Sequence, residues 1–245
     1  MTKVLPAAWT VPDAIRARFG KEAGRQRAMI HDGHLVLVTH AVPITGDVVR
    51  KAALFWRNPE GAWRAAGEAK GSFSALVELV ESYRTRVLTL ESDLERAKSA
   101  NDYFTILNGV APFLRAARNL HKTLQEARDK ITTDAALIAL RDTAYDVERT
   151  AEIVSTDARS GLDFVIAKQA EAQSALSDHI VRSSHKLNLV VALFLPITAL
   201  GSMLGMNLVH GFEKTAEPWL YWGAVVFSFI VGFALRAAIN RKEVA

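Results

Sequence analysis

The sequence of 245 residues contains no cysteine. This absence excludes disulfide-stabilised scaffolds, thiol nucleophiles and metal sites built from thiolates. Proline is also missing between Asp134 and Pro196, and Gly161 is the only glycine in that stretch. Because proline and glycine are the residues that interrupt helices, the stretch is predicted to form one long helix.

Charged residues are missing from two C-terminal stretches, 187–209 and 218–235, although they make up 23% of the chain. These stretches explain a mean hydropathy of +0.10 in so charged a protein. A helix needs about 20 apolar residues to cross a bilayer. We therefore expect two membrane spans, one over 187–206 and one over 219–235 that extends to about 239, and no ordinary soluble enzyme.

Several function classes lack their signatures. The 30 basic residues are dispersed and form no stripe interleaved with aromatic residues, so nucleic acid is not an expected partner. The sequence has no phosphate-binding loop and no G-x-G-x-x-G or G-x-S-x-G motif, which argues against an enzyme. The first 30 residues contain Asp13 and Glu22 and no continuous apolar stretch, so no cleaved signal peptide is expected.

Flanking charge predicts the orientation of the two spans. Arg182 and Lys186 precede the first span, and Arg236, Arg241 and Lys242 follow the second. Positive residues stay on the cytosolic side of a membrane. We expect both termini in the cytosol, a plasma-membrane (bacterial inner-membrane) location, and an outer loop over 207–218. A short basic cytosolic tail, 240–245, follows the hairpin of 187–239.

The part before the membrane is predicted to be a small sheet followed by helices. Asp32-Gly33 indicates a hairpin within 29–39, and Asn58-Pro59-Glu60-Gly61 indicates a second turn. So small a sheet needs helices to pack against. We divide this part into a small α/β domain over 1–71, antiparallel helices over 72–132, and a stalk helix over 133–186. Ser99 to Asp102 and Thr132 to Asp134 are candidate helix caps, and Pro112 is expected to kink or restart the second helix.

Apolar and small residues recur every three or four positions from Leu140 to Leu187. This spacing is typical of a helix that packs on copies of itself. Two spans cannot enclose an aqueous path, so conduction would require several copies around an axis. A monomeric helical bundle on a membrane anchor is the alternative.

The first span is the better candidate to line such a path. Asn188, Leu195, Thr198 and Ser202 fall within about 80° of one another on a helix. A simpler interpretation is that Thr198 and Ser202 bond back to carbonyls of their own helix, since Pro196 leaves one carbonyl free. The second span has Ser228 and two glycines, which suit packing against lipid and another helix.

The triplet Gly205-Met206-Asn207 ends the first span, after Phe194-Leu195-Pro196-Ile197-Thr198 and before an acidic loop. In this the sequence resembles the CorA-type magnesium transporter family, two-span membrane proteins with a Gly-Met-Asn signature. The resemblance is specific over 180–245 and looser over 72–180, where 107–120 is similar to the family's helix before the stalk. It is weak over 1–71, because this domain is much shorter than the corresponding domain of the family.

The resemblance implies a mainly α membrane protein that forms a funnel-shaped homopentamer, with its pore lined by the first span of each subunit. Carried over by position, Gly205, Met206 and Asn207 form the cation entrance. The expected pore-lining residues are Leu187, Leu195, Thr198, Ser202 and Ser184, the last at a position where the family commonly has Met. Glu213 and Glu217 in the outer loop would attract cations. We assign no regulatory metal site and no tightly bound cofactor.

The transported ion is expected to be Mg²⁺, with Co²⁺ or Ni²⁺ as further candidates. Mg²⁺ dehydrates reluctantly, so neutral amide, hydroxyl and carbonyl oxygens suit its water shell better than a tight carboxylate cage. Without a nucleotide motif, transport is expected to be passive and driven by the membrane potential. A Zn²⁺-preferring relative, suggested by His210 in the outer loop, and a non-conducting oligomeric scaffold are the alternatives.

Overall fold

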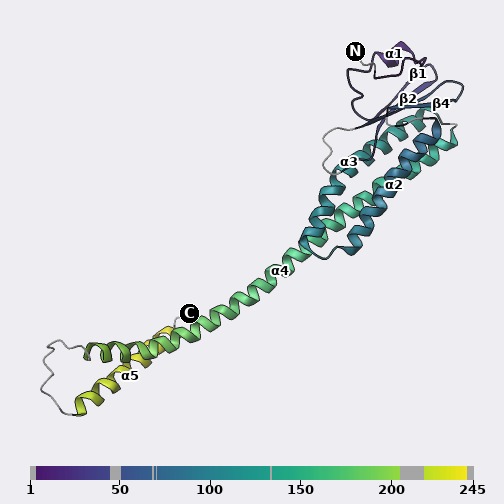
Figure 1. Ribbon diagram of the computed structural model, residues 1–245. Coiled ribbons are helices and arrows are strands. Elements are labelled where there is room, and N and C mark those ends of the chain that lie inside the picture. The colour runs from purple at the N-terminus through teal and green to yellow at the C-terminus, as the bar shows by residue number, and fades with distance from the viewer. Residues whose placement is uncertain are drawn as a thin grey trace. The chain divides into compact units, whose positions relative to one another are not determined.

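A computed structural model describes residues 4–44, 51–67, 69, 71–132, 134–204 and 218–241. The chain divides into two compact units, Met1–Ala167 and Lys168–Ala245, each described here by itself. The elements of the first unit precede the long helix that continues into the second (Figure 1). In chain order the helices and strands of both units are α1 (Asp13–Arg16), β1 (Arg27–His31), β2 (His34–His40), β3 (Ala52–Arg57), β4 (Trp63–Gly67), α2 (Phe73–Arg96), α3 (Ala100–Lys130), α4 (Ala135–Leu204) and α5 (Pro218–Arg241).

The four strands form an antiparallel sheet in the order β1-β2-β3-β4. The predicted hairpin at Asp32-Gly33 is confirmed: His31 pairs with His34, and the two residues between them have φ angles of 49° and 74°. Two successive left-handed residues match the twist of the strands they join, which explains the Asp-Gly sequence. Gly61, with φ at 89°, closes the predicted second turn between β3 and β4.

Both faces of the sheet are covered. Leu35, Leu37 and Phe55 point to the helices, as the small size of the sheet predicted. The alternate residues of the same strands face Leu5, Trp9, Val11 and Ile15 of the N-terminal segment. No strand or helix is predicted in this segment from the sequence, because α1 has only four residues and the residues around it show no periodicity. The double burial explains why the middle of β2, from Leu35 to Val38, is apolar without alternation.

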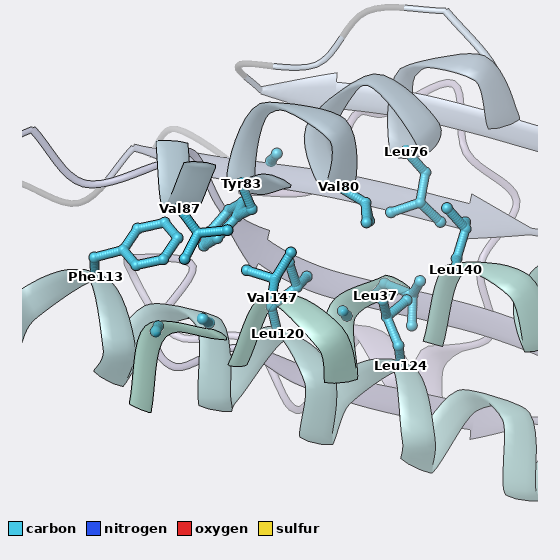
Figure 2. Close-up of a cluster of buried hydrophobic side chains, with 14 of the residues drawn as sticks. Leu37, Leu76, Val80, Tyr83, Val87, Phe113, Leu120, Leu124, Leu140 and Val147 are labelled. Atoms are coloured by element: carbon cyan, nitrogen blue, oxygen red, sulfur yellow. The ribbon is translucent and has the colours of Figure 1, made fainter. Parts of the chain in front are cut away.

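The main core lies where α2, α3 and the first part of α4 meet the sheet (Figure 2). Tyr83 of α2 and Phe113 of α3 are fully buried, with ring centroids 5.6 Å apart. The Tyr83 hydroxyl donates to the backbone carbonyl of His40 at 3.1 Å, so this buried polar atom is satisfied. From α4, Leu140 and Val147 enter the same cluster. Pro112 does not interrupt α3.

Both predicted caps are present. Ser99 accepts a hydrogen bond from the backbone N–H of Asp102, and the Asp102 carboxylate accepts from Lys98 and Ser99. Asp134 caps α4 by accepting from Ala136 and Leu137, at 3.2 and 3.4 Å. The other Asp134 oxygen lies 3.4 Å from Nε of Arg57, which ties the start of α4 to the sheet.

The cap of α3 makes the stability of the fold depend on pH. The backbone N–H groups of Lys98 and Ser99 hold the pKa of Asp102 below its ordinary value of 3.8. The carboxylate therefore stabilises the fold fully above pH 3.8 and loses this effect as the pH falls through that value towards the lower pKa of the folded state. Asp102→Ala should lower the thermal midpoint at neutral pH, with a difference from wild type that shrinks in acid. Circular dichroism melts over pH measure it, and a pH-independent difference contradicts it.

Gly161 is where Tyr103 of α3 lies against α4. A Cβ added at Gly161 would meet the Tyr103 ring at 2.4 Å. Gly161→Ala should therefore destabilise the wild type, since overpacking costs about 1–3 kcal/mol. In a Tyr103→Ala background the same change should stabilise by up to ~1 kcal/mol, because alanine is the better helix former. Thermal melts of the four proteins test this reversal of sign, and equal effects in both backgrounds would contradict it.

Candidate functional site

In the second unit, α5 packs against the C-terminal part of α4. Pro196 of α4 and Ser228 and Gly232 of α5 are buried there. A Cβ on Gly232 would lie 2.8 Å from the carbonyl oxygen of Leu193. Gly232 thus lets the two backbones approach closely, as its sequence context predicted, whereas Gly223 has nothing described within 4 Å.

The predicted pore-lining residues lie on the opposite face of α4. All five are described, and all are exposed: Ser184, Leu187, Leu195, Thr198 and Ser202. At 100° per residue these five residues fall within an arc of about 80° on the helix. Leu193 contacts α5 and Pro196 is buried beside it. These two residues lie roughly 120–180° around the helix from Ser184. These five residues form a stripe of mixed polar and apolar side chains. The stripe is uncovered, because it lies on the side of α4 that faces away from α5. These residues keep their pore-lining role as a prediction.

The hydroxyl of Thr198 donates to the carbonyl oxygen of Phe194 at 2.7 Å. The local back-bonding considered from the sequence is thus present. Ser228 does the same on α5, with 2.8 Å to the carbonyl of Ala224. A hydroxyl has one proton and two acceptor lone pairs, so the exposed Thr198 oxygen can still accept a hydrogen bond from a cation's water shell.

The remaining predicted site residues lie outside the described residues. These are Gly205, Met206 and Asn207 of the triplet, and Glu213 and Glu217 of the loop; His210 is outside as well. The described part of α4 ends at Leu204. The entrance and the loop therefore stay predictions.

The lengths of the apolar stretches on α4 and α5 agree in part with the expected membrane hairpin. Within the described residues, one helix, Ala135–Met203, contains an apolar stretch long enough to cross a membrane. The apolar stretch on α5, Trp222–Ala237, is shorter. The two-span topology and the cytosolic termini remain predictions.

An ionic cluster that sequence analysis missed joins α3 to α4 in the first unit. Arg118 donates to Glu148 at 3.1 Å and to Glu152 at 2.7 Å, and these carboxylates raise the pKa of its guanidinium. His121 lies 2.7 Å from the second oxygen of Glu148. The spacings of three on α3 and four on α4 are the signal in the sequence, since each pair shares a helix face. The cluster links α3 to the first part of α4.

The histidines of the sheet have structural contacts. His34 accepts from the Trp56 indole at 3.1 Å, and His40 contacts the Gly24 carbonyl at 3.0 Å. Among the residues that the structure describes, no three His, Asp or Glu side chains are grouped to hold a metal ion.

Comparison with solved structures places the fold. The ZntB cytoplasmic domain from Vibrio parahaemolyticus RIMD 2210633 aligns with 66% of this chain and 80% of its own, with a TM-score of 0.53 and 12% identity. The chain has the fold of that domain. Two more distant likenesses cover most of this chain: the full-length CmaX protein (91% of this chain, 80% of its own, TM-score 0.49, 15% identity) and the CorA magnesium transporter from Methanocaldococcus jannaschii (89%, 79%, 0.41, 13%). No protein-family model and no curated protein matches the sequence.

A ZntB-like fold agrees with the architecture expected from the sequence: mostly helical, with a small sheet and one long helix. At 12% identity the likeness concerns the fold alone and assigns no ion or residue role.

Proposed function

We propose that the chain is a CorA-type transporter that passes divalent cations, chiefly Mg²⁺, down their electrochemical gradient. The observation that carries this proposal is the uncovered stripe on α4 from Ser184 to Ser202, which leads along the sequence to Gly205-Met206-Asn207. The ZntB-like fold supports the same family.

The pore in this proposal is made by several copies of the chain, most simply five. A single hairpin leaves the stripe of α4 open on one side, because α5 covers only the other. Copies arranged around an axis would bring their stripes together, with Asn207 at the outer mouth, Thr198 as a second polar ring, and Leu195 and Leu187 as constrictions. Rings of leucine can close a pore by dewetting.

The membrane potential alone can drive the proposed transport, without nucleotide hydrolysis. A doubly charged cation that enters a cytosol at a negative potential gains about 4.6 kcal/mol per 100 mV. Neutral oxygens of Asn207 and Thr198 would bind the water shell of Mg²⁺ without holding the ion so tightly that it cannot leave.

Two measurements on one preparation test the proposal. The oligomeric mass in detergent should be that of a pentamer. The same protein in liposomes should take up Mg²⁺ when the interior is made negative, as read by a trapped fluorescent indicator. Vesicles as tight as protein-free ones, together with a pentameric mass, would instead support a non-conducting scaffold.

Ion competition decides between Mg²⁺ and Zn²⁺. His210 lies three residues after Asn207, and imidazole nitrogen suits Zn²⁺ better than Mg²⁺. The proposal expects excess Mg²⁺ to suppress Zn²⁺ uptake more than excess Zn²⁺ suppresses Mg²⁺ uptake. The reverse order would assign the chain to a zinc-preferring transporter.

A further inference from the structure

A cavity of about 640 Å³ lies between α2 and α3 of the first unit, near the turn that joins them. The two helices run side by side (Figure 1). Leu90 and Ile106 are buried apolar residues of its lining, and Ala97 and Gly109 line it as well. Small-molecule sites typically enclose about 300–1,000 Å³ and combine apolar walls with a few polar groups. The cavity therefore has the size and the apolar base of a site for a small organic molecule.

Two arginines of α2, Arg86 and Arg96, line the same cavity. Arg86 is half-buried and Arg96 is exposed. Among the residues that the structure describes, neither guanidinium has a hydrogen bond or an ion pair, whereas Arg84 of the same helix pairs with Glu81 at 3.7 Å. The planar guanidinium matches phosphate oxygens two at a time. Since Arg86 and Arg96 are about 15 Å apart along the helix axis, they suit an elongated ligand that carries several anionic groups.

Carboxylates in the cavity require that such a ligand also brings a cation. Asp93 and Asp102 line it together with the arginines. Asp102 caps α3, but the Asp93 carboxylate has no hydrogen bond or ion pair within the described part of the chain. Both would repel a bare anion. Mg²⁺ is typically held by one or two carboxylates together with the phosphates of a bound molecule, an arrangement that satisfies the arginines and Asp93 at once.

We propose that this cavity binds a nucleoside polyphosphate as its Mg²⁺ complex. Arg86 and Arg96 hold the phosphate oxygens, and Asp93 accepts hydrogen bonds from the water shell of the Mg²⁺ ion. The nucleobase lies over the apolar base of the cavity, at Leu90 and Ile106. All of these residues belong to the first unit, and the proposal does not depend on the proposed function.

Calorimetric titration of the purified full chain in detergent tests the proposal, with ATP as the probe in excess Mg²⁺ or in EDTA. We expect saturable binding of one ATP per chain with Mg²⁺, and binding about tenfold weaker or more with EDTA, because the carboxylates then face an uncompensated anion. Adenosine and magnesium pyrophosphate each carry only part of the ligand and should bind more weakly. Absence of saturable binding of ATP with Mg²⁺ at millimolar concentration, or equal affinity with and without Mg²⁺, would overturn the proposal.

Arginine variants locate the binding site. Arg86→Ala and Arg96→Ala should each weaken binding of ATP with Mg²⁺ by about tenfold or more, because each removes hydrogen bonds to a charged group. Arg84→Ala is the matched control, since Arg84 lies on the same helix and does not line the cavity, and it should bind as the wild type does. Thermal melts establish that each variant folds. Arg96 is exposed, so a folded Arg96→Ala protein with wild-type affinity would place the ligand elsewhere and refute the proposal.

An aspartate variant tests the metal contact. Asp93→Asn should remove most of the gain in ATP affinity that Mg²⁺ gives over EDTA, because it removes the charge that faces the ion. Glu95→Gln should keep that gain, since Glu95 is an exposed carboxylate of α2 outside the cavity lining. The same ratio of affinities in both variants would contradict the role of Asp93.

Discussion

Asn207→Ala is expected to reduce potential-driven Mg²⁺ flux by about tenfold or more, since one hydrogen bond to a charged group contributes about 1.5–3 kcal/mol and 1.4 kcal/mol is a factor of ten. In the proposed assembly every subunit supplies one such amide to the entering ion. The variant should still assemble, because the change removes only a polar side chain from the mouth.

Flux in liposomes and mass in detergent are measured together for this variant. Asn119→Ala is the matched control, since it removes the same exposed side chain from α3 of the first unit, outside the predicted pore. A fully conducting Asn207→Ala protein would remove the triplet from the ion path. Loss of the pentamer would show that Asn207 acts in assembly instead.

Gly232→Leu is expected to part the two helices of the second unit. The Cβ alone would meet the Leu193 carbonyl oxygen at 2.8 Å and its Cα and Cδ1 at 3.3 Å. The first of these distances is too short to persist, and a backbone cannot yield as a flexible side chain does. Overpacking of this kind costs about 1–3 kcal/mol. Both the thermal midpoint in detergent and the flux should fall, because the exposed stripe of α4 depends on α5 covering its other side.

Gly223→Leu is the internal control for this prediction. Gly223 lies on the same helix, and a Cβ there has nothing described within 4 Å. The variant should assemble and conduct nearly as the wild type does. Equal losses in the two glycine variants would mean that leucine harms α5 in general, and that Gly232 has no special contact.

Local sequence signals predicted most of the fold. Asp32-Gly33 marked the β1–β2 turn, because two left-handed residues in succession favour that dipeptide. Ser99 and Asp134 marked the starts of α3 and α4 through their capping side chains. The length of α4 followed from missing proline and glycine. In each case the determinant lies within a few residues of the structure that it specifies.

Contacts between distant segments were not predictable in the same way. The N-terminal layer of Leu5 and Trp9 has no periodicity of its own and is recognised only by the second buried face of β2 and β3. The salt bridge between Arg57 and Asp134 joins residues far apart in the sequence. The contact of Gly161 with Tyr103 likewise depends on how α3 meets α4.

The residues of the candidate site likewise differ in how far they could be predicted from the local sequence. Helical spacing placed Asn188, Leu195, Thr198 and Ser202 on one face, and the family resemblance added Leu187 and Ser184. The structure adds that α5 covers the opposite face. The roles of the triplet and of Glu213 and Glu217 came from the family resemblance and lie outside the described residues. In the proposed pentamer such roles would involve several copies of the chain, whose arrangement a single sequence does not specify.

The most direct test of passive divalent conduction is the reversal potential of Mg²⁺ currents through the purified protein in a planar bilayer. With a tenfold Mg²⁺ gradient and impermeant anions, the current should reverse at about 30 mV, since a divalent ion gains about 4.6 kcal/mol per 100 mV and a tenfold ratio corresponds to 1.4 kcal/mol. The sign of this potential should invert with the gradient. Currents no larger than those of the bare bilayer, or a reversal potential that ignores the Mg²⁺ gradient, would contradict the account.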